Sequence, residues 1–155
     1  MRRFSTVALA VVALLLGMGA YGAAQSETFL EGKVRTGDRI TVGSDDVVDG
    51  DLYVFGGDVS IEGRVTGDLV VFAGQVSIGG DVGGDVIAGA GTVDIDGDVA
   101  GDVRAGTGQL QVGGSVGEDV FVGAGRLDAP GAIGGDLVFG AGQVLVSGDV
   151  GGDVL

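Results

Sequence analysis

The chain has 155 residues, enough for one domain with a hydrophobic core; 35 are glycine, one is proline, and 45% are apolar. This composition excludes collagen, which needs abundant proline, and a disordered chain, which needs far less apolar content. Cysteine and histidine are absent, which removes disulfides, thiolate metal sites and the commonest general base. The net charge of −14 argues against a nucleic-acid partner, because phosphate binding needs clustered cations.

The acidity comes from 18 Asp and 4 Glu set against seven Arg and one Lys. One interpretation is solubility through mutual repulsion. The other, which we favour, is adaptation to high salt, because abundant Asp with almost no Lys is typical of halophilic proteins. At about 1 M salt the Debye length is only about 3 Å, so such a surface would be well screened.

Residues 1–24 have the pattern of a secretory signal peptide. Arg2 and Arg3 precede an uncharged run from Val7 to Met18, and the small residues Gly22 and Ala24 precede a plausible cleavage point. The alternative is an uncleaved N-terminal anchor, because residues 4–24 carry no charge and are long enough to span a bilayer. Both interpretations predict an exported protein, extracytoplasmic and in the cell envelope or associated with the membrane.

Residues 25–49 are less regular, and we interpret them as a leader with an imperfect capping turn. Ile40 and Val42 form an apolar pair two residues apart, and Val48 follows them. A terminal turn differs in composition from the others because it closes an open hydrophobic end.

Residues 50–155 consist of six 17-residue repeats and a truncated seventh, without insertion or deletion. The second position is always Asp, and the eighth and fourteenth are always Gly. Apolar or small residues occupy the third, fifth, tenth, twelfth and sixteenth positions. The repeats begin at Gly50, Gly67, Gly84, Gly101, Glu118, Gly135 and Gly152.

Residues two apart in a strand share a face, so these apolar positions define three inward-facing segments per repeat, separated by glycine corners. We therefore predict an all-β fold, a single-stranded parallel β-helix (β-solenoid) with three short strands per 17-residue turn. We expect glycine at the corners because it adopts backbone angles that other residues avoid. The period itself leaves the handedness open.

The aspartates of the second position form the first candidate site, because one carboxylate per turn would line up along the stack. Such a column could bind divalent cations. Alternatively each Asp accepts local backbone N–H groups in an Asx-turn, the interpretation we favour. A weaker metal candidate is the group Asp94, Asp96 and Asp98, which has calcium-loop spacing but no downstream Glu.

No catalytic or cofactor-binding residues are predicted, and we expect no enzyme activity. Turns of equal length leave no loop to form a cleft. Arg64, Arg104 and Arg126 occupy different positions of the repeat and do not converge. Phe55 and Phe72 share the sixth position near Tyr53, and this group predicts either packing at a corner or an aromatic strip that binds glycans.

The rhythm G-D-[VL]-x-[VA] followed by G-x-[VL]-x-[IV]-x-G-x-V, clearest in residues 67–82, resembles the bactofilins, or polymer-forming cytoskeletal proteins. The resemblance covers residues 50–155. It implies a right-handed parallel β-helix, end-to-end polymerisation into nucleotide-free filaments and a scaffolding role at the membrane. Typical bactofilins are cytoplasmic, whereas this chain begins with an export signal. It is therefore more similar to secreted relatives of halophile type.

The expected function is that of an exported structural scaffold that self-associates end to end or docks to an envelope partner. The sequence stops four residues into a repeat, and the interpretation that supports this function is that Leu155 belongs to an apolar edge that pairs with another chain. The alternative interpretation is that the chain is a fragment of a longer one. The alternative function is a surface adhesin or glycan-binding module that uses Phe55 or Phe72.

Overall fold

The computed structural model describes residues 34–155, which contain parallel strands and no helix. The predicted signal peptide and residues 25–33 of the leader lie outside this range. The strands are β1 (Val34–Val42), β2 (Val47–Val48), β3 (Leu52–Ile61), β4 (Arg64–Val65), β5 (Leu69–Phe72), β6 (Gln75–Ile78), β7 (Val86–Ile95), β8 (Val103–Val112), β9 (Val120–Ala129) and β10 (Leu137–Val146).

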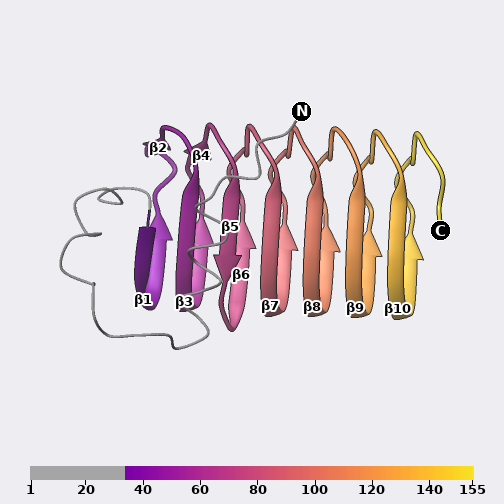
Figure 1. Ribbon diagram of the computed structural model, residues 1–155, viewed down its shortest axis with the longest axis horizontal. Helices are drawn as coiled ribbons and strands as arrows, with labels where there is room; N and C mark the ends of the chain where they lie inside the picture. Colours follow the sequence, from indigo (N-terminus) through magenta and orange to yellow (C-terminus); the bar gives the residue numbers. More distant parts are fainter. Residues whose placement is uncertain (1–33) are drawn as a thin grey trace, which may run out of the picture. The chain divides into compact units, whose positions relative to one another are not determined.

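Each strand pairs in parallel with the equivalent strand of the next turn, which confirms the predicted β-solenoid (Figure 1). The main sheet has the order β1-β3-β5-β7-β8-β9-β10; β6 pairs with β3 and β7, and β2 pairs with β4. Residues of β8 pair with residues 17 positions later in β9, as Val103 does with Val120. The sixteenth positions are joined by single-residue bridges, from Val65↔Val82 to Ile133↔Val150.

In most turns the first two predicted segments run together as one ten-residue strand that bends near its middle. In β8 the first arm is 103–106 and the second arm is 109–112. Only in the turn of β5 and β6 are the two arms separate strands. In Figure 1 the first arms descend on the near side and the second arms ascend behind them while the chain advances towards β10. The coil is therefore right-handed.

The core consists of the apolar positions that the repeat predicts. In the turn of β7, Val86, Val93 and Ile95 are fully buried, and Ala88 and Val99 are nearly so. The equivalent residues of the neighbouring turns stack on them and are buried too. β-branched residues suit these positions because their stiff side chains pack well as ladders along a sheet.

The corner glycines have a different cause from the expected one. Among the described residues only Gly50 has a left-handed φ, of 92°, so unusual backbone angles do not explain the others. At the fourteenth position the reason is close packing between turns. A Cβ on Gly114 would overlap the carbonyl oxygen of Gly97, and one on Gly97 would overlap that of Gly80.

The first described turn is two residues longer than the others. Ile40 pairs with Val59 and Val42 with Ile61, whereas Val48 pairs with Val65 in the ordinary register. The extra residues lie in the corner that follows β1. There the Gly43 N–H donates to the Asp46 carboxylate at 3.0 Å, and the Asp46 N–H donates to the Gly43 carbonyl at 2.9 Å.

Candidate functional site

The second-position aspartates form a continuous hydrogen-bonded column along the solenoid. Asp102 Oδ1 accepts the backbone N–H of Asp119 at 3.0 Å, and Asp119 Oδ1 accepts that of Asp136 at 2.8 Å. The same bond recurs from Asp51 to Asp153. The carboxylates therefore join adjacent turns through backbone N–H groups 17 residues ahead. The Asx-turn interpretation had the correct kind of donor but placed it locally.

In this arrangement Oδ1 of each aspartate accepts the N–H of the next turn, and Oδ2 is left for contacts on the outer surface. At two neighbouring steps the outward oxygens bind the same side chain. Arg104 Nη2 lies 2.7 Å from Asp102 Oδ2, and its Nη1 lies 3.6 Å from Asp85 Oδ2. The guanidinium carbon also lies 5.6 Å from the centre of the Phe121 ring. The site thus holds one cation between two carboxylates and an aromatic ring, a favourable geometry for arginine.

The prediction that Arg64, Arg104 and Arg126 do not converge leaves this cluster out, because Arg104 meets carboxylates and an aromatic ring and no other arginine. The available signal was the spacing of Asp102 and Arg104. Residues two apart in a strand share a face, so the repeat places the Arg104 side chain beside the aspartate column. Asp102 is only 3% exposed, which makes the cation next to it a structural requirement as well as a surface feature.

The candidate metal residues Asp94, Asp96 and Asp98 lie at the end of β7 and in the corner after it. Asp94 is half-buried on β7, and the other two are exposed. Asp98 Oδ1 accepts the Ser115 N–H at 2.9 Å, a turn-to-turn bond like those of the main column. Within residues 34–155, no group of three or more acidic side chains is placed to hold a metal ion.

The aromatic group lies on the first arms of β3 and β5. The rings of Phe55 and Phe72 stack with centroids 5.8 Å apart and planes 8° from parallel. A Cβ on Gly89 would meet the Phe72 ring at 2.7 Å, so this ring lies against the backbone of the next turn. Tyr53 is nearly buried, and burial, followed by the charges of Asp51 and Asp68, raises the pKa of its hydroxyl.

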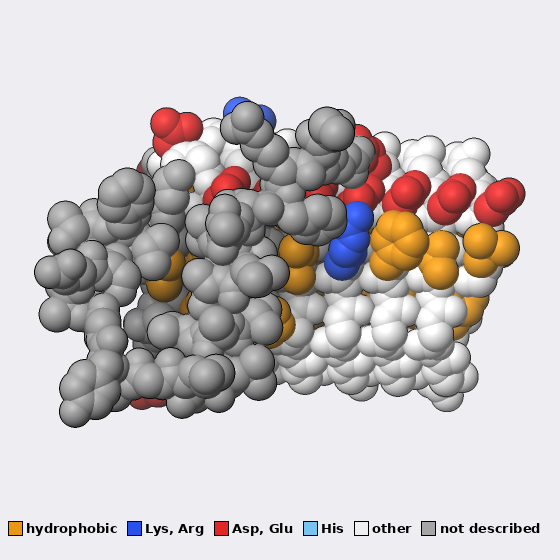
Figure 2. Space-filling model, viewed as in Figure 1, with side chains coloured by type: hydrophobic (Ala, Val, Ile, Leu, Met, Phe, Trp, Pro, Cys, Tyr) orange, Lys and Arg blue, Asp and Glu red, His pale blue; other side chains and the backbone are white. Residues whose placement is uncertain are grey.

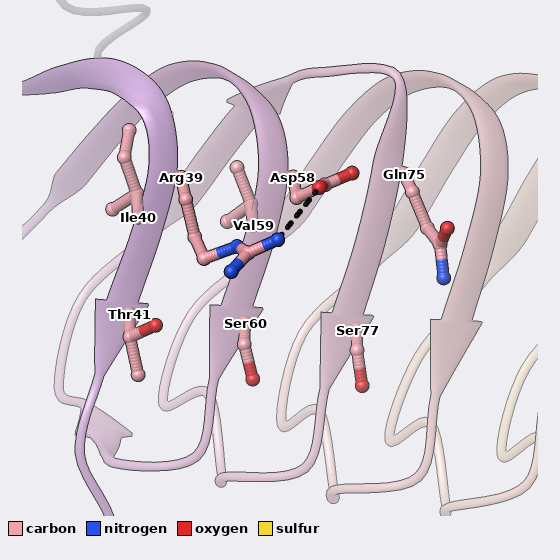
Figure 3. A pocket seen from close by; sticks show the side chains of 8 residues that line it. All are labelled: Arg39, Ile40, Thr41, Asp58, Val59, Ser60, Gln75 and Ser77. Atoms are coloured by element: carbon pink, nitrogen blue, oxygen red, sulfur yellow. Dashed lines mark ion pairs between the residues drawn. The ribbon is translucent and has the colours of Figure 1, made fainter.

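Two shallow hollows lie on the outward face of the second arms. The larger, of about 240 Å³, is lined mainly by polar side chains of β1, β3 and β6, with the Arg39–Asp58 ion pair across it at 3.7 Å (Figure 3). The other, of about 220 Å³, includes Asp94, Gln109, Arg126 and Asp128. Both are smaller than typical small-molecule sites.

Comparisons of this chain with protein-family models, with curated proteins and with solved structures give no match. None of the described residues belongs to a helix that could cross a membrane.

Proposed function

We propose that this protein is an exported structural scaffold that self-assembles by end-to-end stacking of its β-solenoid. The observation that carries the proposal is the uniform pairing of the described turns. β10 pairs with β9 in the same parallel register, 17 residues apart, as β9 pairs with β8. A turn of a second copy would find the same backbone groups to pair with.

The core supports the same interpretation. The apolar positions of each internal turn are buried by the equivalent positions of its neighbours. A turn of a second copy would be held by the same contacts. The favourable free energy would come mainly from removing apolar area from water.

The resemblance to bactofilins is the second support, since it implies polymerisation without nucleotide. The export signal adds a location in the cell envelope or outside the cell. The net charge of −14 adds a condition, because like-charged copies repel each other unless salt screens them. We therefore expect assembly to strengthen as salt rises.

The test is to measure the oligomeric state of the chain in high salt. Sedimentation velocity and negative-stain microscopy over a wide range of concentration provide the measurement. Val144→Lys places a charge in a core position of β10, and we expect it to abolish filaments or oligomers. Gln143→Lys adds the same charge to the outward face of the same strand and should leave assembly intact. A wild-type chain that stays monomeric at all concentrations would refute the proposal.

A surface adhesin or glycan-binding module is the second candidate, favoured by the exposed edge of Phe72. Sugar rings pack on open aromatic faces, however, and the faces of Phe72 lie against Phe55 and Gly89. Retention of a glycan on an array, lost in Phe72→Ala, would favour this candidate over the scaffold.

A further inference from the structure

The outward side of the first arms of β7–β10 carries three parallel columns, which we call the ladder face. The aspartate column runs along one border. Beside it, the fourth positions lie in register, namely Ile87, Arg104, Phe121 and Val138. Figure 2 shows over β8–β10 a row of acidic side chains beside a row of hydrophobic side chains that includes one basic side chain. The third column, at the sixth positions, consists of glycines.

Over β8–β10 the glycine column is not required by the fold. A Cβ on Gly106, Gly123 or Gly140 would meet nothing within 4 Å, and none of the three has a left-handed φ. Glycine inside a strand is destabilising relative to alanine. These residues leave a strip of bare backbone next to the apolar column, whereas Phe55 and Phe72 occupy the same position in the turns of β3 and β5.

The apolar column is exposed enough to bind a partner. Ile87 is 37% exposed and Phe121 is 38% exposed, and Val138 continues the column in half-buried form. The column lies beside carboxylates on one side and bare backbone on the other. A partner must therefore combine apolar side chains with cationic ones.

Arg104 shows what the ladder face binds, because it supplies one such cation from within the chain. Its guanidinium is held by Asp85 and Asp102 and lies over Phe121. One turn further, Asp119 and Asp136 repeat the two carboxylates, but they form no ion pair with any described residue. The position equivalent to Arg104 is there taken by Phe121 and then by Val138. No described residue supplies a cation at this second step.

The spacing of the turns selects the conformation of the partner. Turns repeat at about 4.8 Å along the axis, so three steps span about 14 Å. An α-helix rises about 1.5 Å per residue, so side chains at i, i+3, i+7 and i+10 fall close to successive turns. In an extended strand, residues on one face are about 6.6 Å apart and would not match.

We propose that the ladder face over β8–β10 docks a basic amphipathic helix of another protein. Its Lys or Arg side chains bind the outward oxygens of Asp119 and Asp136, and its apolar side chains pack on Phe121 and Val138 beside the glycine strip. The net charge of −14 disfavours a second copy of the chain or an anionic lipid surface at this face. The side of the solenoid stays accessible whether or not its ends stack.

The probe is a fluorescein-labelled synthetic helix with Leu at i, i+3, i+7 and i+10 and Arg along one flank, titrated with the full chain at about 0.15 M salt. We expect saturable binding by anisotropy, and none for the same helix with Glu in place of Arg. Asp119→Asn with Asp136→Asn should weaken binding about tenfold or more. Asp94→Asn with Asp128→Asn makes the same charge change on the second arms and should have a much smaller effect.

The glycine strip is tested by Gly106→Thr with Gly123→Thr, which covers it with residues suited to strands. We expect at least a tenfold loss of affinity with unchanged or higher melting temperature, and little change for Gln109→Thr with Gln111→Thr on the other face. Equal losses in the two aspartate pairs, or binding that survives the two threonine substitutions, would overturn the proposal.

Other occupants of the ladder face are distinguished by the same variants. Co-sedimentation with phosphatidylcholine vesicles that is lost in Phe121→Gln, or lateral association lost in that variant, would also refute a helical partner. The Val144→Lys chain separates this proposal from end-to-end assembly. Helix binding should persist in it when stacking is abolished.

Discussion

At the scale of single residues, the aspartate column shows a side chain used as an extension of the backbone ladder. Each carboxylate accepts an N–H from the next turn, so the strand pairing continues past the start of every first arm. Like charges about 4.8 Å apart repel by about 1 kcal/mol in water. The bonded N–H groups and Arg104 offset that repulsion.

Asp119 allows charge and hydrogen bonding to be separated. Asp119→Ala leaves the Asp136 N–H without its acceptor, and we expect it to lower the free energy of unfolding by about 1–2 kcal/mol. Asp119→Asn keeps an acceptor oxygen and should cost clearly less. Urea denaturation measures both. Asp128→Ala, on the other outward face, is the control, and equal losses for Ala and Asn at position 119 would show that charge alone matters.

Tyr53 gives the fold a dependence on alkaline pH. Burial first, and then the charges of Asp51 and Asp68, raise its pKa above the ordinary value of 10.0. The folded state therefore holds this proton more tightly than the unfolded state. The resulting stability is complete below pH 10 and is lost as pH rises through the folded pKa.

Absorbance at the wavelength of tyrosinate measures this pKa in a Tyr21→Phe chain, which leaves Tyr53 as the one tyrosine. We expect its midpoint above 10, and a weaker alkaline loss of stability in Tyr53→Phe. A midpoint at or below the ordinary value would contradict the burial of this hydroxyl.

At the scale of elements, the glycines divide into those that the stacking requires and those that it tolerates. Gly114→Ala places a methyl group on the carbonyl oxygen of Gly97, and we expect a loss of about 3 kcal/mol or more. Gly123→Ala places the same group in open space and should stabilise the fold by about 0.5–1 kcal/mol. Thermal unfolding compares the two, and similar effects would mean that contacts between turns do not decide the corners.

The repeat predicted the core because burial follows directly from alternation along a strand. Val86, Ile95 and Val99 needed no knowledge of other turns. The donor to each aspartate and the true reason for Gly114 depend on contacts between residues 17 apart, and the full Arg104 cluster depends on Asp85 and Phe121 in the neighbouring turns. Such contacts become visible only when adjacent turns are placed against each other. The extra length of the first turn was not predicted for the same reason, because only the pairing of Ile40 with Val59 fixes its register.

At the scale of the whole molecule, the acidic charge and the regular stack act against each other. Stacking aligns like charges in columns, and the described cations are few. Salt at about 1 M reduces the Debye length to about 3 Å, which is shorter than the spacing between turns. The solenoid should therefore be more stable in concentrated salt.

We expect the free energy of unfolding to rise by about 2 kcal/mol or more between low and about 1 M NaCl. Urea denaturation at several salt concentrations measures the rise. Asp119→Asn with Asp136→Asn removes two charges from the column and should reduce it. Stability that falls as salt increases would contradict this account.

The constant register from β3 to β10 also makes the turn a unit of length. Because equivalent residues of adjacent turns differ by 17, removing or duplicating any 17 consecutive residues within this region reconnects each strand to a partner in the same register. The rod can thus lengthen or shorten only in steps of about 4.8 Å. Duplication or deletion of a 17-residue segment of the gene would therefore change the length of the stack by one turn and keep the strand pairing between turns.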